Sequence, residues 1–318
     1  MTSVATTSRL TADARARAKA RPHTPDAGGP GIARIAAGVD GFPEGQDAAT
    51  LGQALAQATG AELMLVAVHS APLLPAPPEL SYTSLRRQAQ RVLTEARDSL
   101  APAARTVTAT GPSVPHALHR IVQRHHRDVL VVGSSRLGAE GRVRISKRTR
   151  QLLCHFECAL AVAPRGMHSH VPRLERIGVG YDGGAESDAA LALAASIARG
   201  AQAELHIQAV VDNRLPTFAW PALSEVLEMT WSEVIQDEAE RARDKALAAG
   251  QRAAVNLEVG VALGRPADAL LALSERVDLL VIGSRRWGPA ARLLLGSTGE
   301  ALMHDSACPV LAVPRPTR

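Results

Sequence analysis

Short apolar runs alternate with segments of helical periodicity through the first half of the chain. Apolar runs of about four to eight residues are typical of strands buried in a parallel sheet, and apolar residues spaced three and four apart are typical of helices. The strands are expected at 32–39, 62–68, 105–109, 129–132 and 160–163. The helices are expected at 47–59, 85–100, 115–126 and 149–156.

The second half repeats the same alternation. Strands are expected at 177–181, 204–211, 257–262, 279–282 and 310–313, and a helix at 230–250. In that helix the side chains expected to face inward are Val234, Ile235, Ala239, Ala242 and Ala246. Strands that alternate with helices predict an α/β fold with a doubly wound parallel sheet. Ligands of such sheets bind beyond the carboxyl ends of the strands.

Two sequence landmarks recur in the same order, which indicates a duplicated domain. RIAAGVDG at 34–41 returns as RIGVGYDG at 176–183, and DVLVVGSSRLG at 128–138 returns as DLLVIGSRRWG at 278–288. We expect two doubly wound domains, at 31–165 and 173–315, joined by a linker at 165–172. Because an exposed apolar edge favours pairing, the last strands of the two domains should join them into an intrachain pseudo-dimer.

Composition narrows the class of protein. The chain has 318 residues and a formal net charge of +5, is 46% hydrophobic but only 3% aromatic, and contains 3 cysteines. No apolar run reaches the roughly 18 residues that span a bilayer. No apolar signal segment is evident. So few cysteines also argue against a fold held together by disulfides. We expect a cytoplasmic protein that does not bind membranes. Residues 1–30 are basic, lack a periodic apolar face and are expected to be disordered.

The segment at 281–302 is the strongest local candidate for a binding site. A strand ends at Gly283-Ser284, and Gly296-Ser297-Thr298 then precede a helix. Glycine lets backbone N–H groups approach an anion, and a helix N-terminus carries partial positive charge. The same residues also fit an ordinary helix cap after a strand. The segment alone leaves both readings open.

The repeated landmarks resemble those of universal stress proteins. The resemblance covers the chain after about residue 30 and rests on the VDG and YDG strand ends, the two Gly-Ser strand ends and the terminal CPVLAVP at 308–314. The nucleotide-binding branch of that family carries a Gly-x2-Gly-x9-Gly-Ser pattern. The resemblance implies that Asp182 and Val210 contact adenosine, that Ile282 and Gly283 lie near the sugar, and that Gly296, Ser297 and Thr298 lie at the phosphates.

Both halves depart from the family pattern. In the second half Arg286 replaces the middle glycine, and Gly288 lies nearby but out of register. The Arg286 guanidinium could pair with phosphates or fill the site, and the two alternatives predict opposite effects of Arg286→Ala and Arg286→Gly.

The first half departs further. It retains Gly133, Asp40 and Val68, but Arg136 takes the middle position and Ser146-Lys147 replace Gly-Ser. Its basic loop is either solvated or an anion site made of side chains. Nucleic-acid binding is not expected, because no recognition motif or aromatic platform accompanies the basic residues.

Other chemistry has weaker support. Cys154, His155 and Cys158 lack a fourth metal ligand, so buried apolar cysteines are expected and a metal site is not. An insert at 215–223 that contains Trp220 could cover the mouth of the site or pack in an interface. No catalytic set stands out, and we expect no enzyme activity.

Two functions remain open. The first is an ATP-binding regulator in stress adaptation, with magnesium as the nucleotide's counter-ion and the better site in the second domain. The second is an interaction scaffold that binds no nucleotide, in which Arg136 and Arg286 fill vestigial sites. The protein partner is unspecified, and further homodimerisation is compatible with the pattern.

Overall fold

The computed structural model describes residues 31–70, 81–146, 149–150, 158–169, 173–213, 224–253, 255–284 and 295–314. Side chains of 224–232 are outside this description, as are the expected disordered tail at 1–30, most of the helix expected at 149–156 and the insert at 215–223. Within the described residues, strands and helices alternate in both halves, as the sequence predicts.

The first half contains five strands and three longer helices that the structure describes. In chain order they are β1 (Arg34–Val39), α2 (Pro43–Thr59), β2 (Glu62–Ser70), α3 (Tyr82–Leu100), β3 (Arg105–Gly111), α4 (Val114–Arg124), β4 (Val129–Gly133) and β5 (Ala159–Ala163). A short 3-10 turn, η2 (Met167–Ser169), lies in the linker.

The second half repeats this order. Its elements are β6 (Arg176–Tyr181), α6 (Ala185–Ala201), β7 (Glu204–Val211), α7 (Ser224–Gln251), β8 (Leu257–Leu263), α8 (Pro266–Ser274), β9 (Leu279–Gly283), α9 (Ser297–Asp305) and β10 (Val310–Val313). The predicted bounds of β7 and β10 match the structure, and those of the other strands differ by one or two residues.

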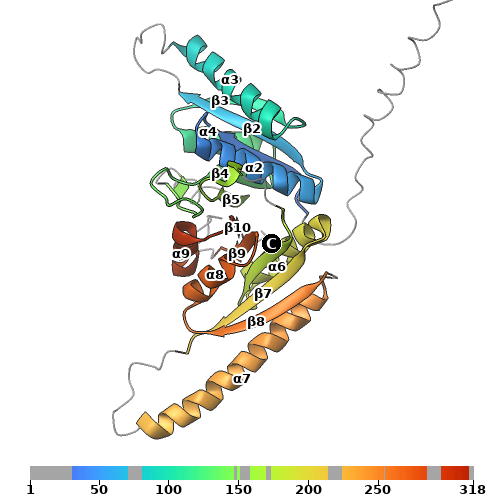
Figure 1. The fold of residues 1–318 in the computed structure, drawn as a ribbon, viewed down its shortest axis with the longest axis vertical. Coiled ribbons are helices and arrows are strands. Elements are labelled where there is room, and N and C mark those ends of the chain that lie inside the picture. The colour runs from blue at the N-terminus through green and yellow to red at the C-terminus, as the bar shows by residue number, and fades with distance from the viewer. Residues whose placement is uncertain are drawn as a thin grey trace, which may run out of the picture.

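One continuous sheet runs through both halves. Its 10 strands lie in the order β3-β2-β1-β4-β5-β10-β9-β6-β7-β8, and pairing is parallel within each half. At the centre β5 pairs antiparallel with β10, with Leu311 opposite Ala161. Figure 1 shows the last strand of the chain at this central position. The prediction that the two apolar last strands join the domains is therefore confirmed.

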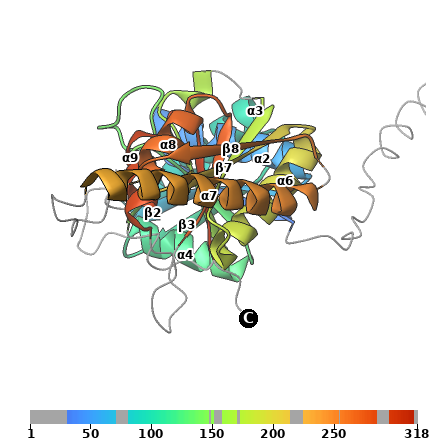
Figure 2. The ribbon, with the colours of Figure 1, turned by 90° about the horizontal axis from the view of Figure 1, so that it is seen from below.

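Helices cover both faces of the sheet, and each face has its own apolar core. On one face α2, α3, α6 and α7 contribute to a cluster that includes Leu55, Ile177 and Ile197. On the other face α4, α8 and α9 contribute to a cluster that includes Leu130, Leu160 and Leu302. Figures 1 and 2 show α7 along the outer strands β7 and β8, and α3 at the opposite end of the molecule. Both cores are continuous across the domain boundary.

Two expectations about helices are wrong in detail. Helix α2 begins at Pro43 rather than at Asp47, because proline is favoured in the first turn, where its missing N–H costs nothing. In α7, Ile235 and Ala246 are buried as expected, but Val234 is 48% exposed. The buried face follows Ile235, Ala242 and Ala246 at helical spacing, and Val234 falls one residue outside it.

Candidate functional site

A pocket opens at the carboxyl ends of β6, β7 and β9 in the second domain, where doubly wound sheets bind ligands. Its volume is about 280 Å³. All of the second-half candidates that the structure describes line it: Asp182, Val210, Ile282, Gly283, Gly296, Ser297 and Thr298. Arg286 and Gly288 lie outside the described residues. The pocket thus brings together residues that are more than 100 positions apart in sequence.

The Asp182 side chain is held in place by the turn that follows β6. Its Oδ1 accepts hydrogen bonds from Gly184 N at 2.8 Å and from Ser187 Oγ at 2.8 Å. Gly183 has a φ of 72°, which permits this turn without strain. Asp182 remains exposed at the pocket. A fixed carboxylate beside a pocket is suited to accept hydrogen bonds from a polar ligand.

The start of helix α9 also lines the pocket. Gly296 is its N-cap residue, with extended backbone and no side-chain cap. The first N–H groups of a helix have no partner within the helix, and together with the helix dipole they favour an anion. Ser297 and Thr298 add hydroxyl groups there, while Glu300 in the same turn is exposed. This end of the pocket is suited to bind phosphate.

Gly283 is required by close packing as well as by its place in the pocket. A Cβ at this position would lie 2.6 Å from the carbonyl oxygen of Glu186 in the first turn of α6. Its counterpart Gly133 has the same constraint, since a Cβ would lie only 1.9 Å from the carbonyl oxygen of Glu44 in α2. The glycine at the end of this strand therefore lets the neighbouring helix start directly above the sheet.

The structure adds lining residues that the sequence analysis missed. They include Gly180, Tyr181, Glu186, Ser187, Gln208, Pro266, Leu270, Leu295 and Gly299. Burial, together with a hydrogen bond from the Tyr181 hydroxyl to Asp188 Oδ1 at 2.9 Å, raises the pKa of Tyr181 to about 12. Gln208 is a buried amide in β7, and a buried polar side chain at the pocket end of a strand is a signal that only the structure supplies.

A second hollow adjoins the first pocket on the α7 side. It also measures about 280 Å³ and shares Tyr181, Asp182 and Val210 with the first pocket. Asp212, Glu238 and Lys245 also line it. Ligand pockets usually measure roughly 300–1,000 Å³, so the two hollows together give space for a ligand of nucleotide size, with Asp182 and Val210 between them.

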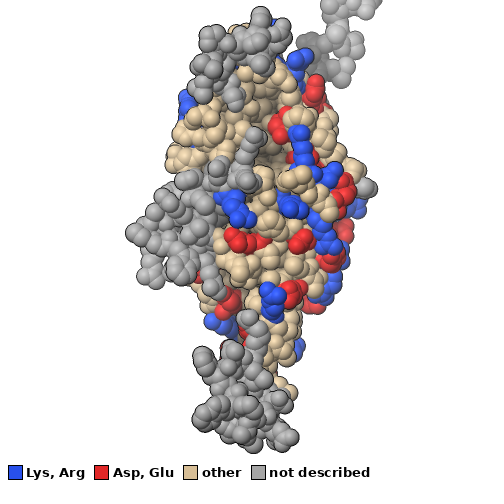
Figure 3. Space-filling view, turned by 90° about the vertical axis from the view of Figure 1, so that its left-hand side faces the viewer, with Lys and Arg blue, Asp and Glu red and all other residues tan. Residues whose placement is uncertain are grey.

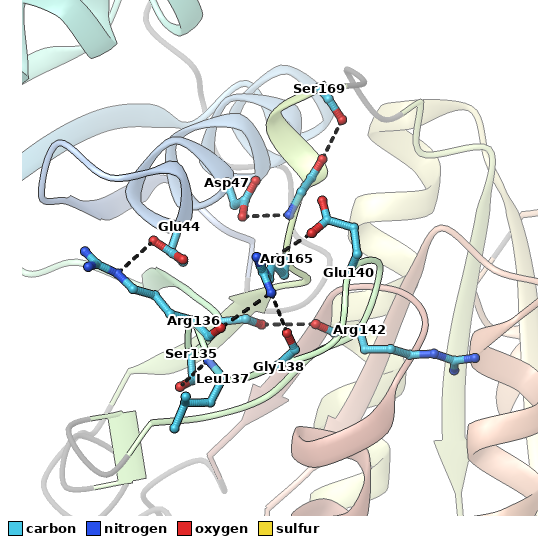
Figure 4. Close-up of polar contacts among 12 residues, drawn as sticks. Glu44, Asp47, Ser135, Arg136, Leu137, Gly138, Glu140, Arg142, Arg165 and Ser169 are labelled. Atoms are coloured by element: carbon cyan, nitrogen blue, oxygen red, sulfur yellow. Dashed lines mark hydrogen bonds and ion pairs between the residues drawn. The ribbon is translucent and has the colours of Figure 1, made fainter.

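The corresponding place in the first domain is arranged differently. The Arg136 guanidinium lies 3.5 Å from the centroid of the Phe42 ring, and its Nε lies 3.4 Å from Glu44 Oε2 (Figure 4). Glu44 is the counterpart of Glu186, which lines the pocket of the second domain. Arg136 therefore covers the start of helix α2 in the first domain.

The remaining first-half candidates are not gathered around a described pocket. Asp40 and Gly133 end the paired strands β1 and β4, and Val68 lies near the end of β2. Burial raises the pKa of Asp40, although a hydrogen bond from Phe42 N and the charge of Arg136 act in the opposite direction. Ser146 Oγ accepts a hydrogen bond from Thr149 N at 3.1 Å, and Lys147 lies outside the described residues.

The basic loop that follows β4 is not simply solvated, which corrects one of the two readings of this loop. Val143 and Ile145 are buried in the core that contains Leu302 and Met303 of the second domain. The backbone N–H groups of Val143 and Ile145 donate to Ser306 O and Met303 O, at 2.8 and 2.9 Å. The middle of the loop is thus part of the domain interface, although Arg136 and Arg144 remain exposed.

Cysteine and histidine groups elsewhere offer little chemistry. Cys158 and Cys308 are both buried, and burial raises the pKa of each thiol to about 12, so both remain protonated at neutral pH. Cys154 and His155 lie outside the described residues. Glu204, His206 and Glu258 cluster at the other end of β7 and β8. There both ring nitrogens of His206 face carboxylates, at 3.3 and 3.1 Å.

The described surface carries charges of both signs. On the face shown in Figure 3, acidic and basic side chains lie next to each other rather than forming one positive field. The broad basic stripe typical of nucleic-acid binding is not seen on the described part of this face. Among the helices that the structure describes, none is long and apolar enough to cross a membrane.

Comparison with known proteins agrees with this architecture. A solved universal stress protein from Archaeoglobus fulgidus superposes with a TM-score of 0.60 at 19% identity, covering 89% of this chain and 96% of that one, which supports the fold. Universal stress protein Rv2005c of Mycobacterium tuberculosis is 30% identical over 197 residues, or 58% of this chain. Universal stress protein MJ0531 of Methanocaldococcus jannaschii is 30% identical over 149 residues, which span 45% of this chain and 84% of that protein.

The chain spans 61% of the length of the mycobacterial relative. The model of the universal stress protein family matches it twice, over residues 31–164 and 173–314. These two matches cover most of the chain and coincide with the two halves of the sheet. The chain therefore belongs to the universal stress protein family and carries two copies of its domain.

Proposed function

We propose that the protein is an ATP-binding regulator in stress adaptation and that the second domain holds the nucleotide. The observation that carries this proposal is the second-domain pocket, which is lined by Asp182 and Val210 together with Gly296, Ser297 and Thr298. These residue types match the two ends of the ligand, because a carboxylate can accept from a ribose hydroxyl and an uncapped helix start can bind phosphate.

In this proposal each part of the pocket has its own task. Asp182 is fixed by Ser187 and Gly184 and binds the sugar. Leu270 and Ile282 offer apolar contact to the base or sugar. The first N–H groups of α9, with the hydroxyls of Ser297 and Thr298, bind the phosphates. A magnesium ion bound to the phosphates would neutralise part of their charge.

The first domain acts as a structural partner in this proposal. Arg136 lies on Phe42 and Glu44 at the start of α2, at the place that corresponds to the second-domain pocket. The loop that would otherwise approach phosphates is packed against the second domain through Val143 and Ile145. We therefore expect one nucleotide per chain rather than two.

We also propose that the nucleotide is held rather than turned over. Among its described lining residues, the pocket has the carboxylates Asp182 and Glu186 and no histidine or lysine. Lys245 lines the adjoining hollow, and Asp182 is already engaged by two donors. Appreciable MgATP hydrolysis that disappears in Asp182→Ala would contradict this part of the proposal.

The direct test is calorimetric titration of the nucleotide-free chain with MgATP at moderate salt. The proposal predicts saturable binding with about one site per chain. The rival function is an interaction scaffold that binds no nucleotide, and Arg136 supports it for the first domain. A titration without saturable binding would favour the scaffold for the whole chain.

A further inference from the structure

Helix α9 connects the pocket of the second domain to the first domain. Ser297 and Thr298 at its first turn line the pocket. Met303, Asp305 and Ser306 at its other end contact the loop that follows β4 of the first domain. Figure 1 shows α9 beside this loop, at the boundary between the domains. A single short helix therefore lines the candidate pocket at its start and contacts the other domain at its end.

The contacts at the end of α9 satisfy carbonyl groups that the helix itself leaves unpaired. The last carbonyls of any helix lack an intrahelical donor. Ile145 N donates to Met303 O at 2.9 Å, and Arg142 Nη1 donates to Asp305 O at 3.1 Å. Val143 N donates to Ser306 O at 2.8 Å, one residue beyond the helix. The first domain thus supplies the C-terminal cap of a helix in the second domain.

Charge and packing support the same contact. The Arg142 guanidinium also pairs with Glu275, which caps helix α8, at 2.6 Å. A cation near the last turn of a helix interacts favourably with the helix dipole. Val143 and Ile145, on either side of Arg144, are buried in the core that includes Leu302 and Met303.

The capping loop is anchored within its own domain (Figure 4). Arg165 Nη1 donates to Gly138 O at 2.8 Å, and Arg165 N donates to Arg142 O at 3.1 Å. Ser134 Oγ donates to Ala163 O at 2.7 Å and accepts from Arg144 N at 3.1 Å. Contacts within the first domain thus help to hold the loop in the position from which it presents Arg142.

We propose that Arg142 is a positioning residue for the ligand of the second domain, and that the first domain orders the phosphate-binding start of α9 by capping its end. This inference rests on the proposed function. A short helix is marginal on its own, so loss of its cap should leave the N–H groups at its start less ordered. Because linkage is reciprocal, nucleotide bound at the start of α9 should also strengthen the contact between the domains.

The experiment compares Arg142→Ala with Arg144→Ala in the full chain. Arg144 lies in the same loop, but its guanidinium donates to Leu137 O within the first domain, so it is a matched control. Two quantities are measured in each protein: MgATP affinity by calorimetry, and amide hydrogen exchange of 297–305. We expect Arg142→Ala to weaken binding by about fivefold and to speed exchange in α9, with Arg144→Ala unchanged and Arg142→Lys in between.

The outcomes separate this inference from the proposed function. Unchanged affinity in Arg142→Ala, with the wild-type protein binding MgATP, would overturn the positioning role. Unchanged exchange in α9 would overturn the capping role whether or not nucleotide binds. A wild-type protein that binds no MgATP would defeat the proposed function and the positioning role together, while faster exchange in Arg142→Ala would still support the capping role.

Discussion

His168 in the linker lies 2.6 Å from Asp47 in helix α2, measured from Nδ1 to Oδ1. Asp47 is fully buried and also accepts hydrogen bonds from Gly166 N at 3.0 Å and His168 N at 2.8 Å. One carboxylate thus fixes the chain where it leaves the first domain. The second copy has Ala189 at the corresponding position, as expected if this carboxylate serves the linker alone.

Replacement of Asp47 should destabilise the protein strongly. Asp47→Ala leaves two backbone donors and the imidazole without their acceptor, and hydrogen-bonding groups left without a partner should cost about 3 kcal/mol here. Urea unfolding measures this loss, with Gln46→Ala as a control in the same helix, because Gln46 is exposed. A loss in Asp47→Ala no larger than that of the control would show that the linker contact contributes little.

Removal of the Arg136 side chain should open the first domain. Its contact with Phe42 and its ion pair with Glu44 are partly exposed, so their loss in Arg136→Gly should cost only about 1 kcal/mol of stability. The greater backbone freedom of glycine in the unfolded chain adds a separate cost. With the helix start uncovered, we expect MgATP titration to detect a second, weaker site. A stoichiometry that stays at one would mean that the lost Gly-Ser pair, rather than Arg136, prevents binding there.

The effect of replacing Asp40 on protein stability should depend on pH. Its pKa is raised, mainly by burial, so the folded state disfavours the ionised carboxylate. The protonated Asp40 carboxyl therefore contributes stability at low pH. This contribution is lost as pH rises through the folded-state pKa. Asp40→Asn should therefore gain stability relative to the wild type between about pH 3 and pH 7. Urea midpoints at both ends of this range test the sign, and a relative loss at neutral pH would contradict it.

The domain interface should not tolerate a side chain at Gly200. This residue lies near the end of α6, where a Cβ would be 1.7 Å from Ala58 O of α2. Gly200→Val should force the two helices apart and lower stability by about 2 kcal/mol or more. Gly31→Ala is the control, since nothing lies within 4 Å of a Cβ there. Equal melting temperatures for the two variants would rule out the close α2–α6 contact.

Sequence patterns predicted the sheet and the second-domain site for the same physical reason. Buried parallel strands appear as apolar runs, and candidates such as Asp182 and Gly283 follow directly where those runs end. Parallel order then places strand ends together. Gln208 was missed because it continues the polar alternation of Glu204 and His206 along β7, and its burial is visible only in the structure.

The docking of the basic loop could not be predicted from the sequence. Arg142 contacts a carbonyl 163 positions away, and a backbone acceptor leaves no trace in residue types. Val143 and Ile145 alternate with Arg142, Arg144 and Ser146, so the segment has the composition of a solvated loop. Their burial depends on the second domain, whose position is set by pairing of β5 with β10.

The central claim is that the second domain binds nucleotide and the first does not. Asp182 and Asp40 occupy corresponding strand ends, so Asp182→Ala and Asp40→Ala make a matched pair for calorimetric titration with MgATP. The account predicts that Asp182→Ala weakens binding at least about tenfold, while Asp40→Ala retains wild-type affinity and one site per chain. Loss of binding in Asp40→Ala with retention in Asp182→Ala, or no change in either variant, would contradict it.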